Sequence, residues 1–477
     1  MVFLQIFMVF SSAYFLLLFF PLTLLLYFIV PNKYRNLVLL VASLYFYTYG
    51  EKFLVLVMIL STLVDYRCGI LIEEGKQKLG LRISILTNLI TLGVFKYFNF
   101  AIDNLYVLLE SLNINTSSLH NIPEVVLPLG ISFYVFQTMS YTIDVYRGNV
   151  KADRNLLEFA TYVTMFPQLV AGPIVRYIDV QKEITNRDVN IYDFAKGLER
   201  FVIGLTKKML IANTFASTAD IIFTESGGGF STLNAWLGII AYSFQIYYDF
   251  SGYSDMAIGL GKMFGFNFLE NFNYPYISKS IQEFWRRWHI SLSTWFRDYL
   301  YIPLGGNRKG KYRTYLNLFI VFLVTGLWHG AEWTFIIWGL YHGIFIVIEK
   351  LGFNKILKKT WTPIQHLYAL LVVNVGWALF RVDNFGAAIA YLKTMFVYTE
   401  GNQTTNDFIT YFNSTNELIF TTVIALIFAI PTYPYLEARM KNNNFLVLRY
   451  CTIIIMLLIC IVYIAAGSYN PFIYFRF

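Results

Sequence analysis

The sequence predicts an all-α polytopic membrane protein, and three observations lead to this fold class. Hydrophobic residues make up 57% of the 477 residues and charged residues only 14%, whereas soluble domains carry about 25% charged residues. Apolar runs long enough to cross a bilayer as a helix, which takes about 17 to 25 residues, recur along the chain. These runs lack the period-two alternation of a membrane β-barrel, so the spanning elements are helices.

The apolar runs give the expected number and order of helices. We expect about 11 to 12 transmembrane helices, with re-entrant and interfacial helices between them, in a single membrane-embedded domain over 1–477. The first run has neither the basic region nor the cleavage site of a secretory signal, so we expect a retained helix. The runs lie near residues 9–31, 36–50, 53–71, 82–101, 125–146, 201–222, 234–261, 315–330, 333–349, 363–382, 417–435 and 446–468.

The distribution of Lys and Arg predicts the orientation of the chain. The positive-inside rule places segments rich in these residues in the cytoplasm and segments that lack them outside, which puts both termini outside. Topology thus accounts for the net charge of +8, and we expect membrane lipids, not nucleic acid, as partners. The rich segments are 65–82, 147–208, 262–313 and 350–359, and the segments without Lys or Arg are 102–124 and 213–235.

The three cysteines show no sign of a metal site. Cys68, Cys451 and Cys460 lie in or beside apolar runs, without the spacing of zinc ligands or of a disulfide framework. Packing is their expected role, and we expect no metal.

Two segments interrupt the helical pattern. Residues 166–173 form an apolar stretch too short to cross the membrane, between two basic stretches, so we expect a re-entrant loop that lines a cavity. Residues 262–314 interleave aromatic residues with Lys and Arg, which is typical of helices at the membrane interface. Their glycine-rich end carries Arg308 and Lys309, which could neutralise a phosphate group, although such basic loops more often only satisfy topology.

Two histidines beside tryptophans, His289 and His329, are the candidates for chemistry. A neutral imidazole in hydrocarbon must be hydrogen-bonded, so a structural role is one alternative. An imidazole can also remove the proton of a hydroxyl group that attacks an acyl carbon. No Gly-x-Ser-x-Gly motif supports a serine acyl-enzyme, so we expect direct transfer with His329 as the base. Gly326 and Gly330 are expected to leave room for a substrate next to His329.

Acidic residues inside an apolar run need a partner. Asp249 and Asp255 are expected to pair with Arg286, Arg287 or Arg297, and helix pairing is at least as good an explanation as substrate contact. The other histidines are expected at packing, loop or interface positions: His120, His342 and His366.

Six segments together resemble the membrane-bound O-acyltransferase family, in its branch of bacterial alginate O-acetylation. They follow one another in the family's order over most of the chain, and they are specific together although each alone is weak. Such sequences often begin at the position of Met8, so Met1 and Met8 are both candidate starts. The segments are LPLGISF (127–133), VAGP (170–173), YDFSGYSDMA (248–257), NFNYPY (271–276), FWRRWH (284–289) and GLWHG (326–330).

The resemblance implies a central funnel, with His329 as the catalytic histidine and His289 as the second functional residue. It also implies acetyl-CoA as a cytoplasmic donor at a bacterial inner membrane, with no bound cofactor. The acetyl group would pass to an extracytoplasmic acetyltransferase partner or to a polysaccharide such as alginate. The residues expected to bind substrate are Trp285, Arg286, Arg287, Trp288, Trp328, Asp249, Arg308 and Lys309.

Other functions remain open on the sequence alone. Within the family, D-alanyl transfer to teichoic acid and O-acetylation of peptidoglycan are alternatives, because acceptor choice carries no motif. A lipid or ion transporter would also contain intramembrane acids and histidines, but no pair of broken helices occupies corresponding places in two halves of the sequence. A scaffold for exopolysaccharide partners is a third class.

Overall fold

The chain is built from α-helices joined by loops and short π- or 3-10-helical turns. The computed structural model describes residues 8–116, 122–224, 231–382, 384–400, 416–432, 435, 443–467, 469–471 and 473. Over these residues it contains no β-strand, which confirms the all-α fold class.

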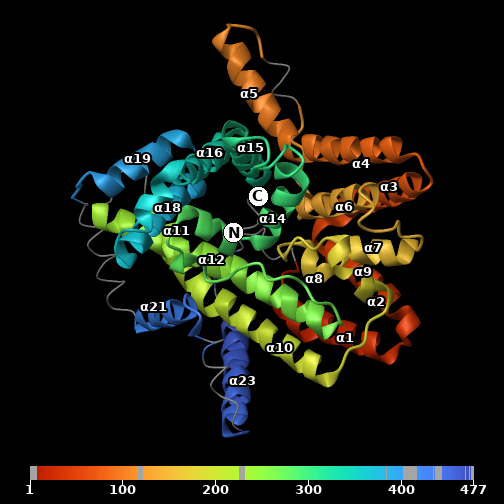
Figure 1. Cartoon of the computed structure of the whole chain (residues 1–477). Helices are drawn as coiled ribbons and strands as arrows, with labels where there is room; N and C mark the ends of the chain where they lie inside the picture. Colours follow the sequence, from red (N-terminus) through yellow and green to blue (C-terminus); the bar gives the residue numbers. More distant parts are fainter. Residues whose placement is uncertain are drawn as a thin grey trace.

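The helices begin and end as follows. Up to residue 224 they are α1 (Phe20–Ile29), α2 (Arg35–Glu51), α3 (Val55–Glu73), α4 (Gln77–Leu92), α5 (Phe98–Ser111), α6 (Ile131–Tyr146), α7 (Leu156–Thr164), α8 (Phe166–Leu169), α9 (Tyr177–Thr185), α10 (Ile191–Thr206) and α11 (Asn213–Thr224). Beyond it they are α12 (Thr232–Met263), α13 (Ile281–Arg287), α14 (Ile290–Phe296), α15 (Lys311–His329), α16 (Trp333–Ile348), α17 (Asn354–Leu357), α18 (Thr362–Arg381), α19 (Phe385–Phe396), α21 (Asn416–Phe428) and α23 (Asn443–Ala465). In Figure 1, α12 crosses the middle of the view, and α5 and α23 project from the body at its upper and lower edges.

Within the described residues, five helical segments are long and apolar enough to cross a membrane, which confirms a multi-pass membrane protein. Two predicted runs, 36–50 and 53–71, form one of these segments, which bends at Lys52, where φ is 51°. Other predicted runs are helical but shorter or more polar, as in α6 and α12. The five segments are Asn32–Glu73, Gln77–Ser111, Trp333–Leu357, Thr362–Arg381 and Leu446–Ala465.

The long helix α12 is buried along most of its length, although it contains acidic and hydroxyl side chains. It packs closely on α10 at paired glycines. A Cβ on Gly252 would lie 2.7 Å from the carbonyl oxygen of Gly204, and one on Gly259 would lie 2.5 Å from that of Gly197. Small residues allow membrane helices to approach in this way. Because neighbouring helices cover α12, its polar residues face protein instead of lipid.

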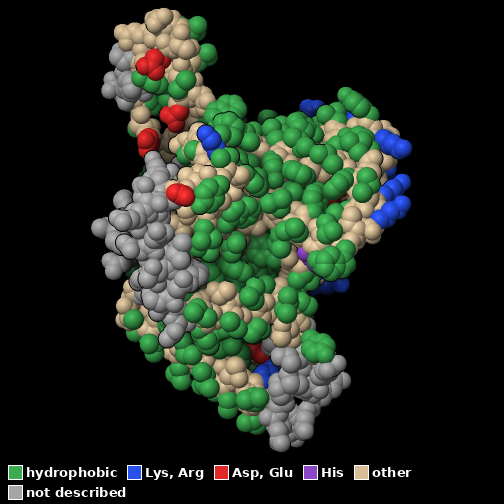
Figure 2. All heavy atoms as spheres, turned by 90° about the vertical axis from the view of Figure 1, so that its left-hand side faces the viewer, with side chains coloured by type: hydrophobic (Ala, Val, Ile, Leu, Met, Phe, Trp, Pro, Cys, Tyr) green, Lys and Arg blue, Asp and Glu red, His purple; other side chains and the backbone are tan. Residues whose placement is uncertain are grey.

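The outer surface is largely apolar. Figure 2 shows hydrophobic side chains over most of one face, with Lys and Arg side chains along one edge. Leu25, Leu60 and Ile454 are among the large apolar side chains that are more than half exposed. Such a surface is unusual for a soluble monomer and fits contact with lipid.

The two predicted interruptions of the helical pattern are present. Residues 166–169 form the short buried helix α8, and Val170, directly after it, lines a cavity. Residues 281–296 form the short helices α13 and α14. The second interruption contains His289, which lies between α13 and α14.

Candidate active site

The structure brings His289 and His329 together around one tryptophan. His329 is the last residue of α15, and His289 immediately precedes α14. The ring of Trp328 lies 5.0 Å from the His329 ring and 5.8 Å from the His289 ring, measured between centroids. Both histidines are buried, with exposed fractions of 1% for His289 and 5% for His329. Two segments about forty residues apart in the sequence therefore form one site.

His329 borders a cavity of about 360 Å³. Apart from Asp249 and His329, the lining is aromatic or aliphatic and includes Trp288, Trp338 and Ile473. An apolar pocket with a few polar groups is typical of small-molecule sites. The imidazole of His329 therefore borders a mostly apolar space.

The side-chain oxygen of Asn271 fixes the protonation pattern of His289. This oxygen lies 3.1 Å from Nδ1 of His289 and accepts hydrogen bonds from the hydroxyl (2.9 Å) and the backbone N–H (3.3 Å) of Ser291. The amide nitrogen of Asn271 donates to the hydroxyl of Ser254 at 3.0 Å. Because an amide oxygen can only accept, Nδ1 carries the proton. The basic nitrogen of neutral His289 is then Nε2.

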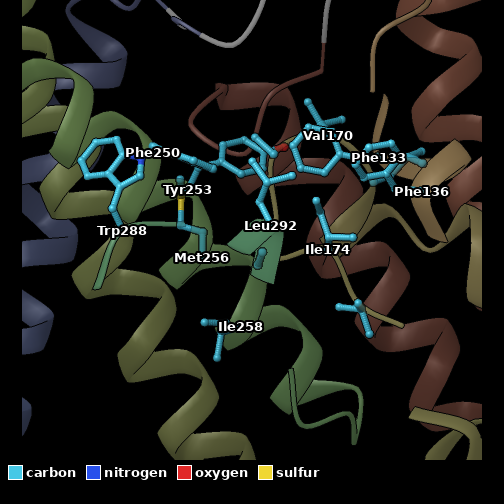
Figure 3. Packing of buried hydrophobic residues seen from close by; sticks show 14 of the residues in the cluster. Phe133, Phe136, Val170, Ile174, Phe250, Tyr253, Met256, Ile258, Trp288 and Leu292 are labelled. Carbon is cyan, nitrogen blue, oxygen red and sulfur yellow. The ribbon is translucent and has the colours of Figure 1, made fainter. Parts of the chain in front are cut away.

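The backbone of His289 adopts the left-handed conformation, with φ 45° and ψ 56°. Residues other than glycine rarely adopt it and keep it only where the surroundings hold them. The His289 ring packs edge-on against Phe250, with centroids 4.7 Å apart. Figure 3 shows Phe250 beside Trp288, and their ring centroids are 6.4 Å apart. This aromatic packing holds the strained residue in place.

The glycines next to His329 serve helix packing. A Cβ on Gly326 would lie 2.4 Å from the carbonyl oxygen of Phe335, and one on Gly330 would lie 2.1 Å from the Phe335 ring. The start of α16 therefore fills the space beside them. The prediction that these glycines leave room for a substrate is wrong, because the sequence does not show which helix covers a glycine.

Asp249 lies in the cavity wall and pairs with a lysine of the π-helical turn after α10. Its Oδ1 is 2.5 Å from Nζ of Lys208, and each side chain is only 3% exposed. Its Oδ2 accepts a hydrogen bond from the backbone N–H of Ile473 at 3.0 Å, and Lys208 also donates to the carbonyl of Pro471. This ion pair thus holds a segment near the C-terminus against the cavity.

The predicted arginine partners of the α12 acids are wrong. Asp255 pairs with Arg200 and Lys207, each at 2.7 Å, and Asp249 pairs with Lys208. These cations come from α10 and the turn after it, which pack on α12. The prediction placed the partners at 286–297, whereas the contact between α10 and α12 decides the pairing.

The two tryptophans of the motif at 284–289 have different surroundings. Trp288 lines the His329 cavity. Trp285 instead packs edge-on against His342, with ring centroids 5.1 Å apart, and against Trp338 at 5.6 Å. His342 is buried among aromatic rings, which confirms its predicted packing position.

The two arginines of the same motif lie outside the cavity lining. Arg286 is exposed, whereas Arg287 is half-buried and pairs with Glu283 at 2.9 Å. Burial alone would raise the pKa of Glu283, but the backbone N–H of Lys279 and the Arg287 guanidinium hold this pKa below its usual value. Arg287 also donates to the carbonyl of Asn273 at 3.0 Å. Both arginines therefore face the surface around α13.

The basic turn before α15 is on the surface. Arg308 and Lys309 are exposed in a turn in which Gly305, Gly306 and Gly310 all have positive φ. No group of three metal-ligating side chains occurs in the residues that the structure describes.

The two remaining histidines lie away from the site or outside the described residues. Nδ1 of His366 lies 3.2 Å from the carbonyl oxygen of Ser278, and His120 lies outside the described residues.

Sequence reasoning missed three residues next to the site. Asn271 was recognised only as part of a motif, and Ile473 lies far from the histidines in the chain, so nothing in the pattern connects it with them. Lys96, which lies buried beside Trp328, could have been found. It interrupts the apolar run at 82–101, and a lysine at such a position calls for an explanation.

Comparison with known proteins places these features in a family. The sequence profile of the membrane-bound O-acyltransferase family matches residues 39–384. The chain is 47% identical to a probable alginate O-acetylase of Azotobacter vinelandii over 84% of its length and 80% of the relative's. It is 42% identical to the probable alginate O-acetylase of Pseudomonas putida over 98% of its length and 100% of the relative's. A peptidoglycan O-acetyltransferase of Helicobacter pylori is 33% identical over 98% of both chains.

Proposed function

Because the chain belongs to the membrane-bound O-acyltransferase family and is an O-acetyltransferase, we propose that it moves an acetyl group from acetyl-CoA in the cytoplasm to an extracytoplasmic polysaccharide. The acceptor would be alginate or another exopolysaccharide, as the names of two relatives suggest. The observation that carries the proposal is the convergence of His289 and His329 around Trp328, beside an apolar cavity.

In the proposed reaction, His329 acts as the general base. Its imidazole takes the proton of an acceptor hydroxyl as that oxygen bonds to the acetyl carbonyl carbon. The bond between this carbon and the sulfur of CoA breaks, and the proton passes to the leaving thiolate. CoA thus leaves as a thiol and is a substrate, not a resident cofactor. The aromatic cavity would keep water, a competing acceptor, away from the thioester.

The donor and the acceptor can be tested together. Purified protein in lipid nanodiscs, given acetyl-CoA labelled in the acetyl group and an oligosaccharide, is expected to yield labelled ester. Label on peptidoglycan fragments alone would favour the function of the 33% identical relative. Transfer only from a D-alanyl carrier would contradict acetyl-CoA as the donor.

His289 is proposed to position the donor, with Asn271 holding its ring. Replacing Asn271 by Ala removes the acceptor that fixes Nδ1–H, and misplacing a catalytic group by about 1 Å can cost about 10²-fold in rate. We therefore expect Asn271→Ala to lower kcat by up to about 10²-fold. The matched control is Asn273→Ala, an exposed asparagine of the same loop, which should keep kcat. Equal rates in the two variants would contradict the role given to Asn271.

The basic turn is proposed to bind the phosphates of acetyl-CoA. Arg308→Glu with Lys309→Glu should raise KM for acetyl-CoA more at low salt than at high salt, because exposed charges are screened over about 8 to 10 Å at physiological ionic strength. The value of kcat should change little, since only donor binding is lost. Lys358→Glu with Lys359→Glu, the same charge change on another exposed basic segment, is the control. An unchanged KM in the first double variant would limit the turn to a topological role.

We further propose that the whole chain, 1–477, forms one domain in a bacterial inner membrane and passes acetyl groups to an acetyltransferase partner or polysaccharide outside. The basic turn would then face the cytoplasm and the end of α5 the opposite side. In a variant with its native cysteines replaced by Ser, an impermeant thiol reagent applied to intact spheroplasts should label Asn113→Cys but not Asn307→Cys. The reverse pattern would invert the direction of transfer.

A further inference from the structure

A π-helical turn between α4 and α5 holds the end of the helix that carries His329. The turn covers Gly93–Tyr97, and its Lys96 is only 8% exposed. Nζ of Lys96 donates to the carbonyl of Trp328 and lies 3.4 Å from the carbonyl oxygen of His329. The hydroxyl of the next residue, Tyr97, donates to the carbonyl of Leu327 at 2.7 Å. Two consecutive side chains thus reach the last three carbonyls of α15.

These contacts satisfy a need of any buried helix end. The last four carbonyls of a helix have no partner in a following turn, so where they are buried another donor must satisfy them. In α15, the backbone N–H of Gly330 donates to the carbonyl of Gly326. The remaining three carbonyls receive their donors from Lys96 and Tyr97. A cation at this end of a helix is also favoured by the helix dipole.

Lys96 has no carboxylate partner that would explain its burial by ion pairing. Within the part of the chain that the structure describes, no ion pair includes it. Its other contacts are the hydroxyl of Ser132, at 3.1 Å, and the ring of Trp328, whose centroid is 5.7 Å from Nζ. All of these contacts lead to the end of α15 or to the start of α6. A second cavity, of about 290 Å³, is lined by Lys96, Ser132 and Trp328.

We propose that Lys96 is a positioning residue for His329. It fixes the backbone of Trp328 and His329, and with it the direction in which the imidazole points. The inference rests on the catalytic role proposed for His329, and it gives Lys96 no contact with the reacting atoms. Without the ammonium group, the end of α15 would lose two of its hydrogen bonds and the imidazole would move relative to its substrate.

The test compares Lys96→Met, which keeps the apolar stem without the donor, with Lys96→Arg, which keeps a donor. Lys96→Met is expected to lower kcat by about 10²-fold, as for a displaced catalytic group, with little change in KM for acetyl-CoA. Lys96→Arg should recover much of the loss. Lys33→Met, an exposed lysine elsewhere, is the control and should match the unmodified protein. Wild-type kcat in folded Lys96→Met would overturn the proposal.

Chemical rescue separates positioning from a general loss of structure. In Lys96→Ala, added ethylammonium should enter the vacated space and restore part of kcat, whereas it should not restore His329→Ala. If Lys96→Met does not fold, Tyr97→Phe tests the same support of the end of α15, because it removes the hydroxyl that donates to Leu327. We then expect a smaller loss of kcat at unchanged KM. If neither Lys96→Arg nor added ethylammonium restores kcat, Lys96 has only a structural role. Activity retained in His329→Ala would instead refute the proposed function itself.

Discussion

Replacing His329 by Ala is expected to lower acetyl transfer by about 10² to 10⁴-fold, the usual contribution of a general base. The imidazole borders the cavity in which we place the acetyl group, and the lining offers no second histidine. KM for acetyl-CoA should change little, because the base acts in the transition state. The rate should be measured with purified protein at saturating donor.

The controls for this variant decide between chemistry and packing. His329 is surrounded by Trp328, Trp338 and Phe380, so truncation also removes aromatic contacts. His329→Gln keeps more of the volume and should be about as inactive as His329→Ala. His366→Ala, at a half-buried histidine outside the cavity lining, should keep normal activity. Near-normal turnover in folded His329→Gln would remove this residue from the mechanism.

Hydropathy predicted the helical membrane fold because a bilayer-spanning helix must be apolar wherever lipid surrounds it. This rule does not apply to α12, because other helices cover it. α12 is therefore a long helix although it contains acidic residues. Local breaks were predicted only in part. The bend at Lys52 falls between the predicted runs 36–50 and 53–71, whereas the π-helical turn at Gly93–Tyr97 lies inside the predicted run 82–101.

For the site, the sequence predicted the two histidines but not what holds them. His289 and His329 stand beside tryptophans, and this pattern is visible in the chain. Their supports, Asn271 and Lys96, act through contacts that depend on helix packing. The partner of Asp249 was missed for the same reason, because residues 208 and 249 meet only when α10 and the turn after it pack on α12. The acids of α12 pair with none of the three arginines that we expected as partners.

Breaking the buried Lys208–Asp249 ion pair is expected to destabilise the fold strongly. Removing one partner of a buried ion pair leaves an uncompensated charge and costs about 3 to 5 kcal/mol. Lys208→Met should therefore lower the melting temperature in detergent markedly. The double variant Lys208→Met with Asp249→Leu removes both charges, and apolar replacements of a buried pair are often neutral in stability. We expect its melting temperature to recover most of this loss, the rest reflecting the lost hydrogen bonds to Pro471 and Ile473.

Activity in the same double variant tests whether the pair serves the site as well as the fold. Asp249 lines the cavity of His329 and accepts the backbone N–H of Ile473, which lines it too. Leucine at position 249 cannot accept this hydrogen bond, so Ile473 should lose its place against the cavity. A stable but slow double variant is therefore the expected result, measured as kcat beside the melting temperature. A double variant that is both stable and fully active would show that the pair acts in folding alone.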